Sequence, residues 1–147
     1  TSLLIDALQG GAADLRGNIT PGGLYSYIDE ALGAWEQRPL FKTNVSRFTK
    51  IRKVNPEIST EIIQKIVEYF PDYTYCFPLD PTFEDTNVDI AIAENVKIFK
   101  DLQKFFAVGL VRPVDEEYMY FAAMNSKSCK LTAMGHQYWR LVKENKI

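Results

Sequence analysis

The sequence of 147 residues has one histidine and two cysteines, and this scarcity excludes several kinds of site. A metal site needs three or four converging ligands, and His136 with the distant Cys76 and Cys129 does not supply them. We therefore expect no metal and no cofactor. Cysteines without paired or metal-ligand spacing also favour a reduced, cytoplasmic chain over a disulfide-stabilised secreted one.

Long apolar runs, phosphate-binding loops and a strong net charge are lacking as well. No stretch of about 18 apolar residues occurs, so we expect no membrane-spanning helix and no export signal. The glycine pairs Gly10-Gly11 and Gly22-Gly23 lack the lysine and the preceding strand of a phosphate loop. A net charge of −2 argues against a general nucleic-acid binder. A hydrophobic fraction of 46% excludes a disordered chain and permits a core.

Charge is segregated along the chain, which is basic from 38 to 53, acidic from 72 to 94 and mainly basic again from Lys97 onward. The first basic segment also carries apolar residues at three- and four-residue spacing, which predicts a short helix or an irregular arm. Arg47 and Lys50 form a candidate surface there for a partner or a phosphate. The simpler interpretation is a solvated basic face, which the acidic segment balances.

The first 32 residues predict two amphipathic helices joined by a tight turn. The first helix ends at the glycine pair Gly10-Gly11. Thr20 is expected to cap the second helix, Pro21 to begin it and Gly33 to end it. Apolar residues recur in this helix at i, i+3, i+4, i+7 and i+8, which makes one continuous face. Neither helix is able to bury its apolar stripe alone.

These landmarks resemble a segment of the bacterial caspase-like cysteine peptidases. In that family a helix after the catalytic strand ends at a Gly-x-Ala-x-Asp turn, and an Ile-Thr step leads into a helix with a Leu-Tyr-x-Tyr core. The corresponding residues are Gly10-Gly11-Ala12-Ala13-Asp14, Ile19-Thr20 and Leu24-Tyr25-Ser26-Tyr27. Gly22-Gly23 departs from the pattern, because the family usually has a glutamate just before the Leu-Tyr pair.

The resemblance implies that the chain is the C-terminal part of a caspase-like cysteine endopeptidase, because the family's catalytic histidine and cysteine precede this segment. The implied partner is the catalytic domain of the same protein, and no catalytic residue is expected in this chain. Cys129 and His136 are the one pair that suggests a nucleophile and its base. They lack an accompanying acid and an oxyanion-forming glycine element, so we interpret Cys129 as structural and His136 as exposed. Cys76 is expected to be a small buried residue, and Trp35 to close one end of the helical pair.

Residues 56–91 predict a helix followed by a connecting arm. Apolar residues at helical spacing favour a helix over 57–70, which Pro71 ends. Pro71, Pro78 and Pro81 exclude a central strand and predict an extended, aromatic and acidic arm on the surface.

Residues 92–147 predict a helix at 92–108, a strand at 118–124, a return strand at 129–131 and a final helix capped by Thr132. This order resembles the second half of a winged-helix domain, in which the helix reads DNA and the hairpin is the wing. The resemblance implies five binding residues, namely Lys97, Lys100, Lys104, Lys127 and Lys130.

The strand expected at 118–124 is apolar on both faces, which favours burial under a protein partner over contact with phosphates. Tyr118 and Tyr120 are therefore candidates for a partner surface. The predicted class is α+β and mainly helical: a caspase-like helical segment at 1–55, a helix and connecting arm at 56–91, and a winged-helix-like module with a small antiparallel hairpin at 92–147.

The expected function is to brace the catalytic domain and to provide a regulatory or protein-interaction module. The alternatives are a winged-helix DNA-binding transcription regulator and a free-standing interaction protein.

Overall fold

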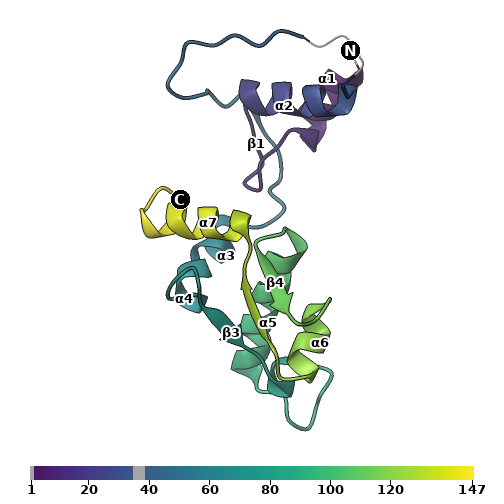
Figure 1. The fold of residues 1–147 in the computed structure, drawn as a ribbon, viewed down its shortest axis with the longest axis vertical. Helices are drawn as coiled ribbons and strands as arrows, with labels where there is room; N and C mark the ends of the chain where they lie inside the picture. Colours follow the sequence, from purple (N-terminus) through teal and green to yellow (C-terminus); the bar gives the residue numbers. More distant parts are fainter. Residues whose placement is uncertain (1, 35–38) are drawn as a thin grey trace. The chain divides into compact units, whose positions relative to one another are not determined.

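The computed structural model describes residues 2–34 and 39–147, and these form two compact units that we treat separately (Figure 1). Unit 1 ends at Glu57, and unit 2 runs from Ile58 to Ile147. The expected class is confirmed, because the chain is 46% helical and 11% strand, with two small antiparallel sheets. The division groups residues 58–91 with the C-terminal third in one unit.

Unit 1 consists of short helices and a two-stranded sheet. Its elements in chain order are α1 (Ser2–Asp6), the π-helical turn η1 (Ala7–Gly11), β1 (Asn18–Ile19), α2 (Pro21–Leu32) and β2 (Arg52–Lys53). The strands are antiparallel, and Asn18 lies opposite Lys53. Gly17, just before β1, has a φ of 77°, and a Cβ there would lie 2.1 Å from the Val54 carbonyl oxygen. Only glycine therefore allows the two strands to approach at this turn.

The limits of α2 are those predicted from the sequence. The Thr20 hydroxyl accepts a hydrogen bond from the backbone N–H of Gly23 at 3.1 Å, and Pro21 is the first helical residue. Gly33 ends the helix with a φ of 68°. These are local signals, so they act whatever the rest of the chain does.

The basic segment after α2 is an irregular arm, the second of the two conformations expected for it. Residues 39–51 contain no helix or strand. The Phe41 ring stacks on Tyr25 of α2 with centroids 5.0 Å apart, and Phe48 lies against Phe41 at 5.8 Å. The arm is thus attached to α2 by its aromatic side chains. Trp35 lies outside the described residues.

Unit 2 contains a three-stranded antiparallel sheet in the order β3-β5-β4, with helices packed against its inner face. Its elements in chain order are α3 (Thr60–Gln64), α4 (Ile66–Tyr69), β3 (Cys76–Pro78), the 3₁₀ helix η2 (Pro81–Phe83), α5 (Ala93–Ala107), β4 (Val111–Val114), α6 (Met119–Met124), β5 (Ser128–Leu131) and α7 (Ala133–Lys143).

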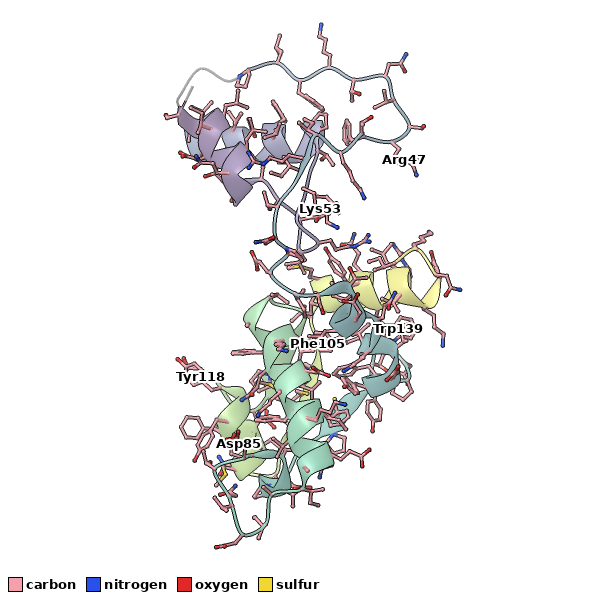
Figure 2. The ribbon with its side chains drawn as sticks, turned by 180° about the vertical axis from the view of Figure 1, so that it is seen from behind. Arg47, Lys53, Asp85, Phe105, Tyr118 and Trp139 are labelled. Carbon is pink, nitrogen blue, oxygen red and sulfur yellow. The ribbon has the colours of Figure 1, made fainter. Side chains whose placement is uncertain are left out.

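The core of unit 2 lies between α5, the short helices and the inner face of the sheet. Phe70, Leu102 and Phe105 are fully buried, and Phe105 lies in the interior of the unit in Figure 2. Val111 and Leu131 contribute from the sheet. Burial of one such side chain stabilises a fold by roughly 1.5–3 kcal/mol, so this core is a real source of stability.

The predicted strand at 118–124 is wrong, because these residues form α6. Met119, Ala122 and Ala123 are buried at i, i+3 and i+4, the spacing of one helical face. The strand that forms the hairpin with β5 is instead β4.

Three smaller expectations also need correction. The helix predicted over 57–70 is two short helices, α3 and α4, which meet at Lys65. Part of the expected arm is the strand β3, which contains Pro78. β3 lies at the edge of the sheet, where the missing N–H of a proline does not have to cost a hydrogen bond to a neighbouring strand. Cys76 in β3 is exposed, not buried, because alternate residues of an edge strand face away from the core.

Candidate interaction surfaces

The helices of unit 1 leave their apolar side open. Neither α1 nor α2 contains a buried residue, and Leu4 and Ile5 are 43% and 49% exposed. Among the described residues of unit 1, the buried apolar side chains are Ala7 and Ile19. Two side chains are far fewer than a stable core needs, so the described part of unit 1 has little core of its own.

The basic arm of unit 1 is exposed along its length. Arg47 and Lys50 are both exposed, and neither side chain forms a hydrogen bond or ion pair with another described residue. Figure 2 shows Arg47 on this arm. Leu40 and Val45 in the same arm are 89% and 60% exposed. The arm therefore offers cationic and apolar groups together, a composition that suits a protein partner.

The three lysines predicted on the recognition-like helix all lie on the exposed side of α5. Lys97, Lys100 and Lys104 follow one another at i, i+3 and i+7. The row is partly neutralised, because the Lys100 ammonium lies 3.5 Å from the Asp85 carboxylate. An acid within the row weakens it as a surface for phosphates.

The two remaining lysines do not join this row. Lys127 is exposed in the turn between α6 and β5. Lys130 lies on the outer face of the sheet, since its neighbours Cys129 and Leu131 face the core. The register places Arg112 of β4 directly opposite Lys130. Sequence reasoning missed Arg112, because the first hairpin strand was assigned to 118–124.

An exposed aromatic cluster lies on α6 and at its start. Tyr118, Tyr120 and Phe121 are 52%, 42% and 48% exposed, and Figure 2 shows Tyr118 projecting from unit 2. The Tyr120 and Phe121 rings lie 5.3 Å apart. Adjacent exposed aromatic rings are typical of protein interfaces, so the two tyrosines remain partner-surface candidates, although on a helix.

Cys129 and His136, the pair considered above as a nucleophile and its base, lie in different environments. Cys129 is fully buried, and burial raises the pKa of its thiol to about 12. Such a thiol stays protonated near neutral pH and is not a nucleophile. His136 is exposed on α7, with its ring 5.5 Å from that of Tyr73. A structural Cys129 and an exposed His136 are the environments expected from the sequence.

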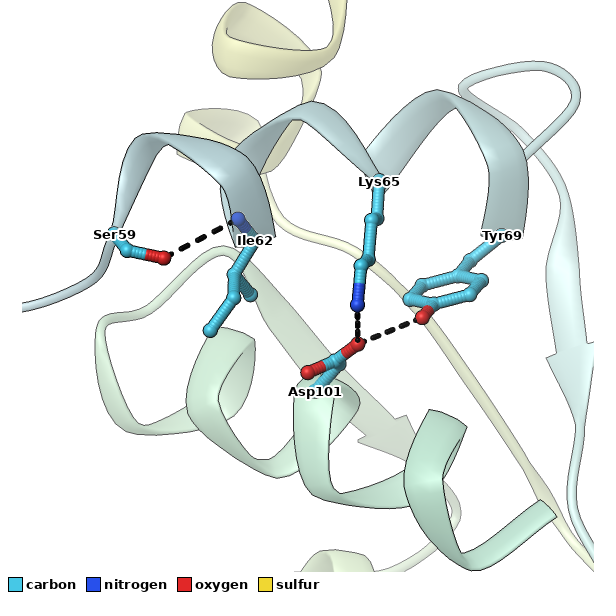
Figure 3. Close-up of polar contacts among 5 residues, drawn as sticks. All are labelled: Ser59, Ile62, Lys65, Tyr69 and Asp101. Atoms are coloured by element: carbon cyan, nitrogen blue, oxygen red, sulfur yellow. Dashed lines mark hydrogen bonds and ion pairs between the residues drawn. The ribbon is translucent and has the colours of Figure 1, made fainter. Parts of the chain in front are cut away.

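The most buried ionic contact is a three-residue bridge between α5 and the first two helices of unit 2 (Figure 3). Asp101 of α5 accepts hydrogen bonds from the Lys65 ammonium at 2.8 Å and the Tyr69 hydroxyl at 2.7 Å. Burial alone would raise the pKa of Asp101, but these hydrogen bonds and the charges of Lys65 and Lys104 lower it below its ordinary value. Both hydrogen bonds join side chains of unit 2 to one another, so the cluster connects its helices.

Two further findings concern the described part of the chain. No three histidine, cysteine, aspartate or glutamate side chains within it gather closely enough to hold a metal ion. None of its helices has both the length and the apolar character that a bilayer span requires.

Comparison with known proteins gives no match: no family model, no curated protein and no solved structure matches this chain.

Proposed function

We propose that this chain is a non-catalytic region of a bacterial caspase-like cysteine peptidase. In this proposal, unit 1 braces the catalytic domain and unit 2 binds a protein regulator. The observation that carries it is the open apolar side of α1 and α2, with Leu4 and Ile5 nearly half exposed and no buried residue in either helix.

The resemblance of residues 1–32 to the caspase-like family indicates that the sheet of the catalytic domain would cover that open side. In the family, the matching helices follow the catalytic strand and lie beside its sheet. A helix pair with two buried apolar side chains in its own unit gains most of its stability from such a neighbour.

The order of elements supports the winged-helix part of the proposal. The two short helices α3 and α4 are followed by β3, the 3₁₀ helix η2, the long α5, β4, α6 and β5, and β5 lies between the other two strands. Here α6 stands where a winged-helix protein has the loop of its wing. A helix that exposes Tyr118 and Tyr120 suits a protein surface better than a phosphate backbone.

One experiment tests the bracing role. The chain is mixed with the catalytic domain of a bacterial caspase-like peptidase, and association is measured by calorimetry. We expect binding that Leu4→Glu and Ile5→Glu abolish, because each places a charge in the buried apolar contact. Gln9→Glu is the matched control, since Gln9 is an exposed polar residue of the same helical segment. Equal losses in all three variants would argue against an apolar contact.

The non-catalytic assignment has its own test. The isolated chain, incubated with caspase-type peptide substrates, should give no turnover. Turnover that disappears in Cys129→Ala would overturn the assignment.

DNA binding remains the second candidate, and the row of Lys97, Lys100 and Lys104 on α5 is the observation that favours it. It predicts duplex binding that is lost when the three lysines are changed to glutamate. It also predicts a steep dependence on salt, with a slope of about −0.9 for each phosphate neutralised. The regulator hypothesis predicts instead that Tyr118→Ala and Tyr120→Ala disturb binding of a protein partner.

A further inference from the structure

An open cleft lies on the outer face of the unit 2 sheet, where the sheet meets the start of α7. Its volume is about 600 Å³, within the usual range of small-molecule sites. The polar and charged lining comes from four segments, and its main members are Tyr73, Thr74, Arg112, Lys130, Thr132 and His136.

The cleft concentrates positive charge without a balancing acid. Arg112 and Lys130 are paired directly across β4 and β5, and like charges in such positions repel each other. No carboxylate lines the cleft. Neither of the two side chains forms an ion pair or hydrogen bond with another described residue. A bound anion would relieve this repulsion, so the pair has the arrangement of an anion site.

One further feature strengthens the positive potential of the cleft. Thr132 and Ala133 at its wall form the beginning of α7, whose 11 residues direct the positive end of the helix dipole to this side. The Thr132 hydroxyl itself accepts from the Gly135 N–H at 3.0 Å, so it caps the helix. Asp72 is not one of the lining residues, and its Oδ1 atom accepts from the backbone N–H and the hydroxyl of the lining residue Thr74.

An aromatic wall adjoins the cationic pair. Tyr73 also borders a second cleft of about 440 Å³, which is lined by Trp139 and Arg140 as well. The Tyr73 ring is 54% exposed and lies edge-on to His136 at 5.5 Å and to Trp139 at 5.9 Å. An exposed ring beside a cationic pocket is a surface on which a nucleic-acid base stacks.

We propose that this cleft binds a nucleoside monophosphate, with its phosphate on Arg112 and Lys130 and its base against Tyr73. The size of the cleft, the unbalanced cross-strand pair and the adjacent ring are three independent reasons for this class of ligand. The inference stands apart from the caspase-like proposal, because it uses residues of unit 2 only.

Calorimetric titration of the full chain with AMP, GMP, CMP and UMP at low salt is the direct test, with inorganic phosphate and adenosine as partial ligands. We expect at least one nucleotide to bind more tightly than either partial ligand. Arg112→Gln and Lys130→Gln should each weaken binding about tenfold or more, because each removes a charge-assisted contact. Lys146→Gln is the matched control, since Lys146 is an exposed lysine of unit 2 outside the cleft. Tyr73→Ala should weaken nucleotide binding and leave phosphate binding unchanged.

Two additional readouts separate a binding role from a structural one. The melting temperature of Arg112→Gln should be unchanged or higher, because the substitution removes a repulsion. Cys76 pairs with Lys130 on its other side and is exposed, so the bound nucleotide should slow its reaction with neutral N-ethylmaleimide.

Three results would overturn the proposal. The first is the absence of binding for all four nucleotides at millimolar concentration. The second is unchanged affinity in Arg112→Gln and Lys130→Gln. The third is far tighter binding of a single-stranded oligonucleotide than of any mononucleotide, which would make the cleft part of a nucleic-acid interface.

Discussion

The carboxylate of Asp101 accepts a hydrogen bond from the Tyr69 hydroxyl at 2.7 Å, which ties α5 to α4 across 32 residues of sequence. The Lys65 ammonium donates to the same oxygen at 2.8 Å from the junction of α3 and α4. Asp101 is 6% exposed, so its charge depends on these two donors for compensation. The bridge orients the first helices of unit 2 against its longest one.

We predict that Asp101→Asn destabilises unit 2 by about 2–3 kcal/mol, because it leaves the partly buried Lys65 ammonium without its counter-charge. Urea unfolding followed by circular dichroism measures the change. Asp89→Asn is the matched control, since Asp89 is exposed in the loop before α5, and it should change stability by less than about 0.5 kcal/mol. Equal effects of the two substitutions would contradict a stabilising role of the bridge.

The same bridge predicts a dependence of stability on pH. The pKa of Asp101 is lowered in the folded chain, since hydrogen bonds and the Lys65 charge outweigh the opposing effect of burial. The folded state therefore binds this proton less readily than the unfolded state does. Its stabilisation is fully present above the ordinary aspartate pKa and is lost as the pH falls through the lowered value. Thermal melts of Asp101→Asn should accordingly decline less steeply in acid than those of the unchanged chain.

Gly135 provides a prediction about packing. A Cβ at this position would lie 2.0 Å from the Leu110 carbonyl oxygen, a backbone atom that also accepts a hydrogen bond from the Thr132 N–H at 3.0 Å. Gly135→Ala should therefore destabilise unit 2 by about 1–3 kcal/mol, as overpacking does. Helix propensity alone predicts the opposite, a gain of about 1 kcal/mol. A raised melting temperature in this variant would mean that α7 does not pack so closely on Leu110. Gln137→Ala, at an exposed position of α7, is the control.

Local signals in the sequence predicted their own structures correctly. Thr20, Pro21 and Gly33 set the limits of α2, and Thr132 caps α7. Each acts through hydrogen bonds or backbone angles within a few residues, so no knowledge of the remaining chain is needed. The helix expected over 92–108 is α5 for the same reason, because its apolar period is long enough to be unambiguous.

The pairing of strands that lie far apart in the chain could not be predicted from the sequence. The segment 118–124 is apolar throughout, and a short apolar run fits a buried strand or a short helix equally well by period. Because this segment was assigned as the first strand of the hairpin, β4 was not recognised as that strand, and the pairing of Arg112 with Lys130 was missed. The pairing of β3 with β5 joins residues about fifty positions apart, such as Cys76 and Lys130, and no turn signal connects them.

Candidate site residues could be grouped from the sequence only where a single helix brings them together. Lysines at 97, 100 and 104 are brought together by α5 itself, as helical spacing requires. Lys130 meets Arg112, Tyr73 and His136 only because β4, β5, α7 and the turn at residues 73–74 converge. A cleft built from four separate segments leaves no compact pattern in the sequence.

Hydrogen exchange should distinguish the two units. Leu102 and Phe105 of α5 have fully buried side chains, so we expect their amides to exchange slowly, close to the limit set by global unfolding. Amides of residues 42–50 lie in an exposed arm without helix or strand and should exchange within the shortest labelling time. Mass spectrometry of peptic fragments after brief deuteration measures both. Slow exchange in the arm of the isolated chain would mean that other residues cover the arm. That result would contradict the exposure of Val45 and Ile51 in the structure.

Thiol reactivity should separate the two cysteines on opposite faces of one sheet. Cys76 in β3 is exposed, whereas Cys129 in β5 is fully buried and burial raises its pKa to about 12. Reaction requires the thiolate, so at pH 8 we expect one reactive thiol in the folded chain and two after denaturation in guanidinium. Cys76→Ala should abolish the fast reaction, and Cys129→Ala should leave it unchanged. Fast modification of Cys129 in the folded chain would show that β5 opens readily or that Cys129 does not face the core, and would undermine the placement of Lys130 on the outer face.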